Sequence, residues 1–374
     1  MAELDALTVA TKRFIRQTPE LVDMVFNAGP LAAYAKQNLR EEFDGGRLIG
    51  ENFLYGGMIG GFYTKGKEFD ITEPQVEQEA QFNMRFMESN VTMTKEDVQV
   101  LNKGGNASFK LIDSRTRNAY MTLGAQIEIA MYLNGQRANY TAMFNGLAEA
   151  ANDGTTVSWD NNAYTTYGTI TRGGAVGNAL NSPAPIDVNG QIEYTGSNGL
   201  EAGYANCSYG PEEWEPNLGV TTYNCYRFIK ERFQTQQRFN DTQDPKIGFN
   251  GLKYNTATIV RSRYCPGAYL FGSSGTADPI AVTFIKQSTN NNLTAYPSPV
   301  GGYPAAGAFS ETFWWINARK PFMNFYVSDD PEFGFGFTGF KPGQGNTKIA
   351  GQVLGSCQVT FAPRYHQQYY RITG

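Results

Sequence analysis

Alternating apolar and polar residues predict a long extended segment in the first third of the chain. From Phe82 to Phe86 the apolar side chains stand two positions apart, as in a strand with one buried face, and Val91 to Met93 continues that pattern. A glycine-rich stretch precedes them. We therefore expect a β-excursion over residues 44–105. A connection this long is uncommon in a compact domain unless it has a task, and the task that we expect is to reach over another subunit.

The first forty residues are expected to form amphipathic helices. Thr18-Pro19-Glu20 supplies an N-cap, a proline at the first helical position and an early carboxylate. Gly29-Pro30 ends that helix, and the proline opens a shorter one that runs towards Leu39. The sequence is equally compatible with an arm that lies on a neighbouring subunit and with helices that pack on their own domain.

The longest predicted helix follows the β-excursion. Asn106 or Ser108 caps its start and Asn134-Gly135 ends it, so that its roughly 25 residues span nearly 40 Å, at about 1.5 Å per residue. Asp113 and Arg117 lie four residues apart and are expected to pair on the solvated face. The apolar positions recur at helical spacing and include Leu111, Ile112, Leu123 and Ile127.

The remainder of the chain predicts a mixed α+β region. A second helix, which includes Tyr140, Phe144 and Leu147, should end at Asn152-Asp153-Gly154. Another is expected from Tyr223 to Phe239. Residues 287–310 carry no charge and should form a surface loop. The β-like runs are separated by Gly, Asn and Pro and comprise residues 164–171, 257–260, 281–285 and 322–327.

Composition favours a β-rich protein with wide aromatic contact surfaces. Charged residues make up only 18% of the chain, and 41 glycines accompany 25 Phe and 22 Tyr, which argues against a helical bundle. A net charge of −4 does not indicate a nucleic-acid binder. No apolar run approaches the ~18 residues of a membrane span, and the acidic segment Met1 to Asp5 is unlike a signal peptide. We expect no membrane partner and synthesis in a cytoplasm.

Each motif that could indicate a catalytic or cofactor site lacks either the structural context or the partner residues that such a site needs. Gly334 to Gly339 matches GxGxxG, but no helix opens after it, so an aromatic-glycine strand or turn is the better interpretation. His366 is the only histidine, which excludes sites with two His ligands, and it is expected to be a packed or surface residue. Adjacent carboxylates at Glu212-Glu213 and Asp329-Asp330 are interpreted as solvated loop charges, because glycosidase carboxylates must face each other across a substrate. The sequence predicts no enzyme, no cofactor and no metal site.

The chain has four cysteines, namely Cys207, Cys225, Cys265 and Cys357, and no CxxC pair. We expect buried free thiols, and a Cys207–Cys225 disulfide is the alternative. Two modest basic spots are candidates to contact DNA through its phosphates, and ordinary exposed charge is the alternative for both. One lies in the N-terminal segment and one on the long helix: Lys12, Arg13 and Arg16, and Arg115 and Arg117.

The order of these segments resembles the coat-protein fold of tailed bacteriophages, called the Hong-Kong-ninety-seven type. In that fold an arm, a long E-loop and a spine helix precede a mixed body. The resemblance covers nearly the whole chain and rests on the joint order more than on any one motif. Its local signatures are residues 53–57, 82–93, 110–134, 144–150, 152–154, 264–267, 313–317 and 333–337.

The resemblance implies a major capsid protein that assembles into an icosahedral head shell around phage DNA. Its partners would be itself, in hexamers and pentamers, a separate scaffolding protein, a portal and non-specifically contacted DNA, in a virion assembled in a bacterial cytoplasm. A β-rich viral fibre, decoration or carbohydrate-binding protein is the alternative. The implied divisions are an arm (1–43), an E-loop (44–105), a peripheral domain with the spine helix (106–159), an axial domain (160–349) and return strands (350–374). The implied E-loop assembly residues are Phe53, Leu54, Tyr55, Gly56, Gly57, Met58, Gly60 and Gly61.

Overall fold

The computed structural model of the chain describes most of the body and all of the β-excursion up to residue 96. Several sequence expectations lie outside the described residues: the helix that begins at Thr18, the caps at Asn106 and Ser108, the strand 281–285 and the uncharged loop up to residue 309. The described residues are 29–96, 111–135, 143–173, 182–209, 214–234, 241–243, 250–267, 310–342 and 347–373.

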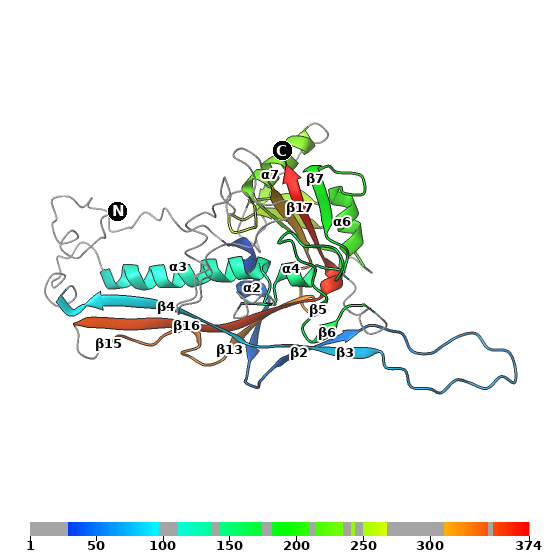
Figure 1. Cartoon of the computed structure of the whole chain (residues 1–374), viewed down its shortest axis with the longest axis horizontal. Helices are drawn as coiled ribbons and strands as arrows, with labels where there is room; N and C mark the ends of the chain where they lie inside the picture. Colours follow the sequence, from blue (N-terminus) through cyan, green and yellow to red (C-terminus); the bar gives the residue numbers. More distant parts are fainter. Residues whose placement is uncertain are drawn as a thin grey trace.

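A six-stranded sheet forms the long axis of the molecule (Figure 1). Its central strand, β16, is 14 residues long, and every position from Gly355 to its end at Phe361 is buried, so that both faces of the strand are covered there. One edge of β16 pairs with β4 from Lys348↔Thr94 to Cys357↔Arg85, and its other edge pairs in turn with β15, β14 and β13. The strands are β1 (Arg40–Phe43), β4 (Arg85–Thr94), β13 (Met323–Ser328), β14 (Gly334–Phe337), β15 (Lys341–Pro342) and β16 (Lys348–Phe361).

Helix α3 (Leu111–Tyr132) runs along this sheet and confirms the predicted long helix (Figure 1). Its first turns are amphipathic: Leu123 is buried against Val91 of β4 and Val353 of β16. Its last turn is buried on every side, and there Tyr132 packs against the ring of Trp314 from the second sheet. The helix therefore joins the two sheets. The short helix α2 (Pro30–Asn38) begins at the predicted proline and packs on α3.

The second sheet has seven strands, and β12, which lies between β17 and β8, is buried on both faces. Phe313 and Trp315 of β12 face a core formed with helices α6 (Leu200–Cys207) and α7 (Tyr223–Gln234), whereas Trp314 and Ile316 face the core around α3. The period-2 alternation of a strand thus places large side chains in both cores. The strands are β7 (Ile186–Gln191), β8 (Leu218–Thr221), β9 (Asp241–Gln243), β10 (Asn250–Tyr254), β11 (Ala257–Arg261), β12 (Glu311–Ile316) and β17 (His366–Thr373).

The expected helix after α3 is much shorter than predicted. Only α4 (Leu147–Ala150) is helical, and residues 143–146 are not. The cause is close packing at Gly146, where a Cβ would meet the backbone oxygens of Leu133 and, at 2.6 Å, of Met131. The extended backbone at Gly146 passes directly over the end of α3 and cannot continue a helix there. Tyr140 lies outside the described residues.

The remaining strand predictions are confirmed or shortened. Strands β11 and β13 occupy the predicted runs 257–260 and 322–327, and α7 confirms the first twelve residues of the helix expected from Tyr223. The run 164–171 contains only the paired dipeptides β5 (Thr166–Tyr167) and β6 (Ile170–Thr171), because the chain reverses at once through Gly168, which has a φ of 58°.

Candidate assembly interface

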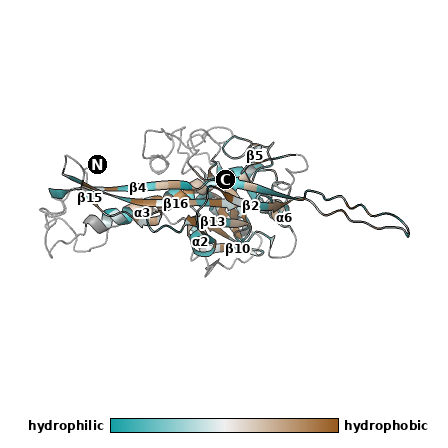
Figure 2. Cartoon of the chain, turned by 90° about the horizontal axis from the view of Figure 1, so that it is seen from below, coloured by the Kyte–Doolittle hydropathy of each residue, from teal (hydrophilic) through white to brown (hydrophobic). Residues whose placement is uncertain are grey.

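A long hairpin leaves the body beside the first sheet (Figure 1). Its arms are β2 (Ile49–Leu54) and β3 (Glu77–Phe82), which pair antiparallel from Ile49↔Phe82 to Leu54↔Glu77. The last ladder bond runs from the Tyr55 amide to the Val76 carbonyl at 2.9 Å. Residues 56–75 then project away from the body in both views (Figure 2). At about 3.3 Å per residue, each arm of this loop reaches roughly 35 Å. We call residues 55–76 the E-loop.

The E-loop carries a concentration of exposed apolar side chains. Phe62 is fully exposed and Ile71 is 94% exposed. Burying one such side chain is worth about 1.5–3 kcal/mol, so the set would contribute on the order of 10 kcal/mol before association costs are subtracted. Patches of this kind mark surfaces that bind another molecule. The exposed apolar residues from the end of β2 to the far arm are Leu54, Met58, Ile59, Phe62, Tyr63, Phe69 and Ile71.

The tip of the E-loop has local order without support from the body. The Lys67 amide donates to the Thr64 carbonyl at 3.1 Å, and Tyr63 and Phe69 meet edge to face with ring centroids 4.9 Å apart. On the returning arm, Thr72 donates hydrogen bonds to Asp70 through its hydroxyl and its amide, and these bonds lower the pKa of the Asp70 carboxyl. The loop is therefore a shaped projection whose apolar side chains remain in solvent.

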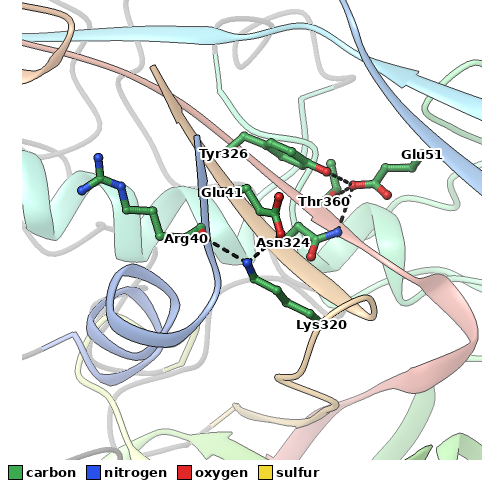
Figure 3. Close-up of polar contacts among 7 residues, drawn as sticks. All are labelled: Arg40, Glu41, Glu51, Lys320, Asn324, Tyr326 and Thr360. Carbon is green, nitrogen blue, oxygen red and sulfur yellow. Dashed lines mark hydrogen bonds and ion pairs between the residues drawn. The ribbon is translucent and has the colours of Figure 1, made fainter. Parts of the chain in front are cut away.

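Glu51 anchors the root of the hairpin to the first sheet (Figure 3). On β2, residues 49, 51 and 53 face the body, so the Glu51 carboxylate points at β13 and β16. Its Oε1 accepts hydrogen bonds that come from Tyr326 at 2.8 Å, Asn324 at 3.1 Å and Thr360 at 2.7 Å. Burial, and then the Glu51 charge, raises the pKa of the Tyr326 hydroxyl, which therefore stays a donor.

An ion pair supports the same region on the other side of β13 (Figure 3). Lys320 Nζ lies 2.6 Å from Glu41 Oε1 and donates a 3.0 Å hydrogen bond to the Arg40 carbonyl. Both side chains are about two-fifths exposed. Exposed pairs of this kind contribute about 0–1 kcal/mol, so this contact fixes the position of β1 more than it stabilises the fold.

The glycines predicted for the E-loop lie in open space. A Cβ at Gly57, Gly60 or Gly61 would meet no atom within 4 Å, and one at Gly56 would touch only Val76. None of these four glycines has a positive φ. Glycine is thus not required by this conformation, and its presence suits a segment that adopts others.

The spine-helix residues divide into buried and surface positions. Leu123 and Ile127 are buried in the core, and the side chains of Leu111 and Ile112 lie outside the described residues. Arg115 donates a 2.6 Å hydrogen bond to the Thr92 carbonyl of β4, whereas Arg117 is exposed. The basic residues Lys12, Arg13 and Arg16 also lie outside the described residues.

Two carboxylates that hold the structure together were missed from sequence. One is Glu51, for which the alternation of Ile49, Glu51 and Phe53 on one strand face was an available signal. The other is Glu128, a fully buried carboxyl group inside the apolar end of α3. It accepts hydrogen bonds from the Ala32 amide at 2.5 Å and from the hydroxyls of Tyr132 and Ser262, both at 3.0 Å. Burial raises the pKa of Glu128.

The described residues among the remaining candidates for chemistry lie in a strand, in the packed interior or in a turn. Residues 334–337 form strand β14, which confirms the aromatic-glycine strand predicted at the GxGxxG match. His366 is packed against Phe361, its Nε2 lies 3.1 Å from the Phe322 carbonyl, and burial lowers its pKa to about 4. Asp329 and Asp330 are exposed in the turn after β13, and Glu212-Glu213 lies outside the described residues.

The four cysteines are buried free thiols, as expected, and the Cys207–Cys225 bridge is not formed. Within the described ranges, no cluster of three His, Cys, Asp or Glu side chains is arranged to hold a metal ion. None of the helices in those ranges has the length and apolar character that a membrane span needs.

Comparison with protein-family models and with curated proteins finds no match to the sequence. The fold, in contrast, matches solved capsid structures over almost the entire chain. The cyanophage A-1(L) capsid asymmetric unit superposes with a TM-score of 0.62 at 13% identity, covering 99% of this chain and 100% of that chain. The capsid of a native GTA particle gives a TM-score of 0.54 at 7% identity, with 99% and 100% covered.

The head structure of Helicobacter pylori bacteriophage KHP40 also matches, with a TM-score of 0.52 at 7% identity over 99% of this chain and 98% of that chain. These similarities confirm the predicted α+β capsid-protein fold. They cover the hairpin, the long helix and both sheets together, and they give no support to the fibre, decoration or carbohydrate-binding alternative.

Proposed function

We propose that this chain is the major capsid protein of a tailed bacteriophage and that it assembles with copies of itself into the icosahedral head shell around the phage DNA. The observation that carries this proposal is the E-loop, an ordered projection with six exposed large apolar residues between positions 58 and 71, next to a seventh, Leu54, at the end of β2. In a solitary molecule these side chains would stay in water. Contact with a neighbour removes them from water without any refolding of the body.

The geometry suits a shell better than a closed dimer. The E-loop lies at one end of the long axis and the far end of β4, β15 and β16 at the other, so one subunit presents two different surfaces (Figure 1). Contacts between unlike surfaces generate rings, and pentamers and hexamers are the rings that an icosahedral shell requires. Permanent assemblies of this type bury about 2,000–5,000 Å² per interface, which a projecting hairpin helps to reach.

The domain divisions, partners and location expected from sequence belong to the same proposal. The arm (1–43) and the E-loop excursion (44–105) reach neighbouring subunits, and the peripheral (106–159) and axial (160–349) domains form the floor of the shell, with the return strands (350–374). A separate scaffolding protein and a portal take part in assembly in the bacterial cytoplasm. The shell of the virion contacts DNA non-specifically through phosphates.

The proposed role is structural and not catalytic.

The DNA-facing candidates are Lys12, Arg13 and Arg16, together with Arg117 on the exposed side of α3. Arg115 is a weaker candidate because its guanidinium already donates to the Thr92 carbonyl.

Sedimentation velocity of the purified chain tests the proposal. Fast-sedimenting capsomers or shells, in proportions that rise with protein concentration, are the expected result. A single species of monomer size at all concentrations would contradict the proposal, and a small monodisperse trimer would favour a fibre instead.

A further inference from the structure

A groove of about 660 Å³ opens on the body near the root of the hairpin. Three connections line it: the turn between β1 and β2, the junction between β3 and β4, and the turn that follows β13. All three connections belong to the first sheet or to the root of the hairpin, so paired strands hold the walls of the groove in place.

The groove has an exposed aromatic wall. Phe86, the second residue of β4, lines the groove and is 69% exposed. Its ring meets Phe333 edge to face with centroids 6.1 Å apart, and Phe333 is itself 40% exposed. Two neighbouring phenyl rings that remain in solvent form an apolar surface ready to receive another aromatic or aliphatic group.

The rim of the groove is acidic. Asp44, Asp329 and Asp330 line it with a single opposing cation, Arg47. Asp330 accepts the amides of Glu332 and Phe333 and so shapes its own turn. Asp44 and Asp329, in contrast, make no hydrogen bond or ion pair with any residue that the structure describes, and both are exposed.

The E-loop tip carries the complementary chemistry. Lys65 and Lys67 flank Gly66, are exposed, and have no hydrogen-bond or ion-pair partner among the described side chains. Immediately beside them stand the paired rings of Tyr63 and Phe69. The tip therefore presents two ammonium groups next to two aromatic rings, and the groove presents two unpaired carboxylates next to two aromatic rings.

We propose that the groove receives the E-loop tip of a second copy of this chain, with Lys65 and Lys67 facing Asp44 and Asp329. The tip cannot serve the groove of its own chain, because the hairpin leads away from the body in both views (Figures 1 and 2). The aromatic contact supplies most of the affinity, and the charges fix the register in which the tip lies. This inference rests on the proposed shell assembly and names the surface that accepts the loop.

Reciprocal charge reversal tests it. Lys65→Glu with Lys67→Glu in one variant, and Asp44→Lys with Asp329→Lys in another, should each lower the yield of assembled particles at least about tenfold at low salt, because like charges then face each other. The variant with all four changes should recover most of the wild-type yield. Asp330 is left intact because it holds its turn. Lys253→Glu, an exposed lysine on β10, is the matched control and should assemble normally.

A zero-length carbodiimide cross-link between an amine and a carboxylate gives an independent reading. In particles assembled from a mixture of isotopically light and heavy chains, Lys65 or Lys67 should be joined to Asp44 or Asp329 in mixed-isotope peptides. Particles that form normally from either double variant, or cross-links from this tip only to other sites, would overturn the inference while the proposed function stands. A wild-type chain that forms no particles would overturn both.

Discussion

The hydroxyl of Tyr326 on β13 donates a 2.8 Å hydrogen bond to the carboxylate of Glu51 on β2. This bond and its two companions join the root of the hairpin to the middle of the first sheet. The direction in which the E-loop leaves the body is thus set by a cluster of polar groups and not by the loop itself. A change at Glu51 should affect assembly more than it affects folding.

Glu51→Ala should remove the common acceptor of three donors, of which Thr360 and Asn324 are buried. Unpaired buried donors cost about 1–3 kcal/mol, so we expect a loss of that size in the free energy of unfolding, measured in urea, together with a low particle yield. Glu51→Gln keeps an acceptor oxygen and should lose less. The matched control is Glu79→Ala on the facing strand, an exposed carboxylate that should change stability by less than about 0.5 kcal/mol. Equal effects at the two positions would refute the anchoring role.

Phe62→Ser combined with Ile71→Ser should abolish assembly and leave the subunit as stable as the wild type. Both side chains are almost completely exposed, so the folded subunit loses no packing when they become polar. Sedimentation velocity reports the assembly, and urea unfolding reports the stability. Leu48→Ser, at an exposed apolar residue outside the E-loop, serves as control and should still assemble. If the double variant formed particles at the same protein concentrations as the wild type, the E-loop would not be the surface that binds the neighbouring subunit.

Two glycines near α3 should respond to alanine in opposite directions. Gly124 lies inside the helix, and a Cβ there would meet nothing within 4 Å, so Gly124→Ala should stabilise the fold by about 0.5–1 kcal/mol. At Gly146 a Cβ would meet backbone oxygens that cannot move away, and Gly146→Ala should cost about 1–3 kcal/mol or more. Thermal unfolding of the two variants measures both changes in stability. If both substitutions stabilised the protein, the inference that Gly146 packs closely against the end of α3 would be refuted.

Glu128 should make stability depend on pH with a definite sign. Burial raises its pKa in the folded state above the ordinary 4.5, so the folded protein holds this proton more tightly than the unfolded chain does. This contribution is fully present below pH 4.5 and is lost as pH rises through the folded-state pKa. Glu128→Gln has no proton to lose at this position. Its stability relative to the wild type should therefore increase as the pH rises from 4.5 through the folded-state pKa of Glu128.

Urea unfolding at a series of pH values measures this difference. The control is the exposed carboxylate Glu79. The difference in stability between the wild type and Glu79→Gln should show no such trend. A stability difference at Glu128 that is constant over the whole range would mean that its carboxyl titrates alike in the folded and unfolded states.

The sequence predicted the elements with strong local signals. The proline at position 30, the alternation of Val91 and Met93 along β4 and the helical spacing of α3 each depend on residues close together in the chain, and all three elements are present. The run from Phe82 to Phe86, in contrast, is not one strand with a buried face, because the chain leaves β3 after Phe82, β4 begins only at Arg85, and Phe86 is exposed. The exposed apolar E-loop could be expected too, because a glycine-rich excursion of that length has no room in a compact body.

The errors came from contacts between distant residues. The helix expected around Phe144 is cut to a single turn because Gly146 meets the end of α3, and no local pattern shows that crowding. The donors around Glu51 come from positions 324, 326 and 360, which only the sheet brings together. The same holds for Ser262, which meets Glu128 across 134 residues of sequence.

Electron microscopy of the purified wild-type chain, beside a variant that lacks Gly56 to Gly61, tests the central claim most directly. The account predicts pentameric and hexameric rings or closed shells for the wild type, and only soluble subunits for the variant with its shortened loop. Wild-type particles that stay solitary at high concentration, or intact shells from the shortened variant, would contradict it.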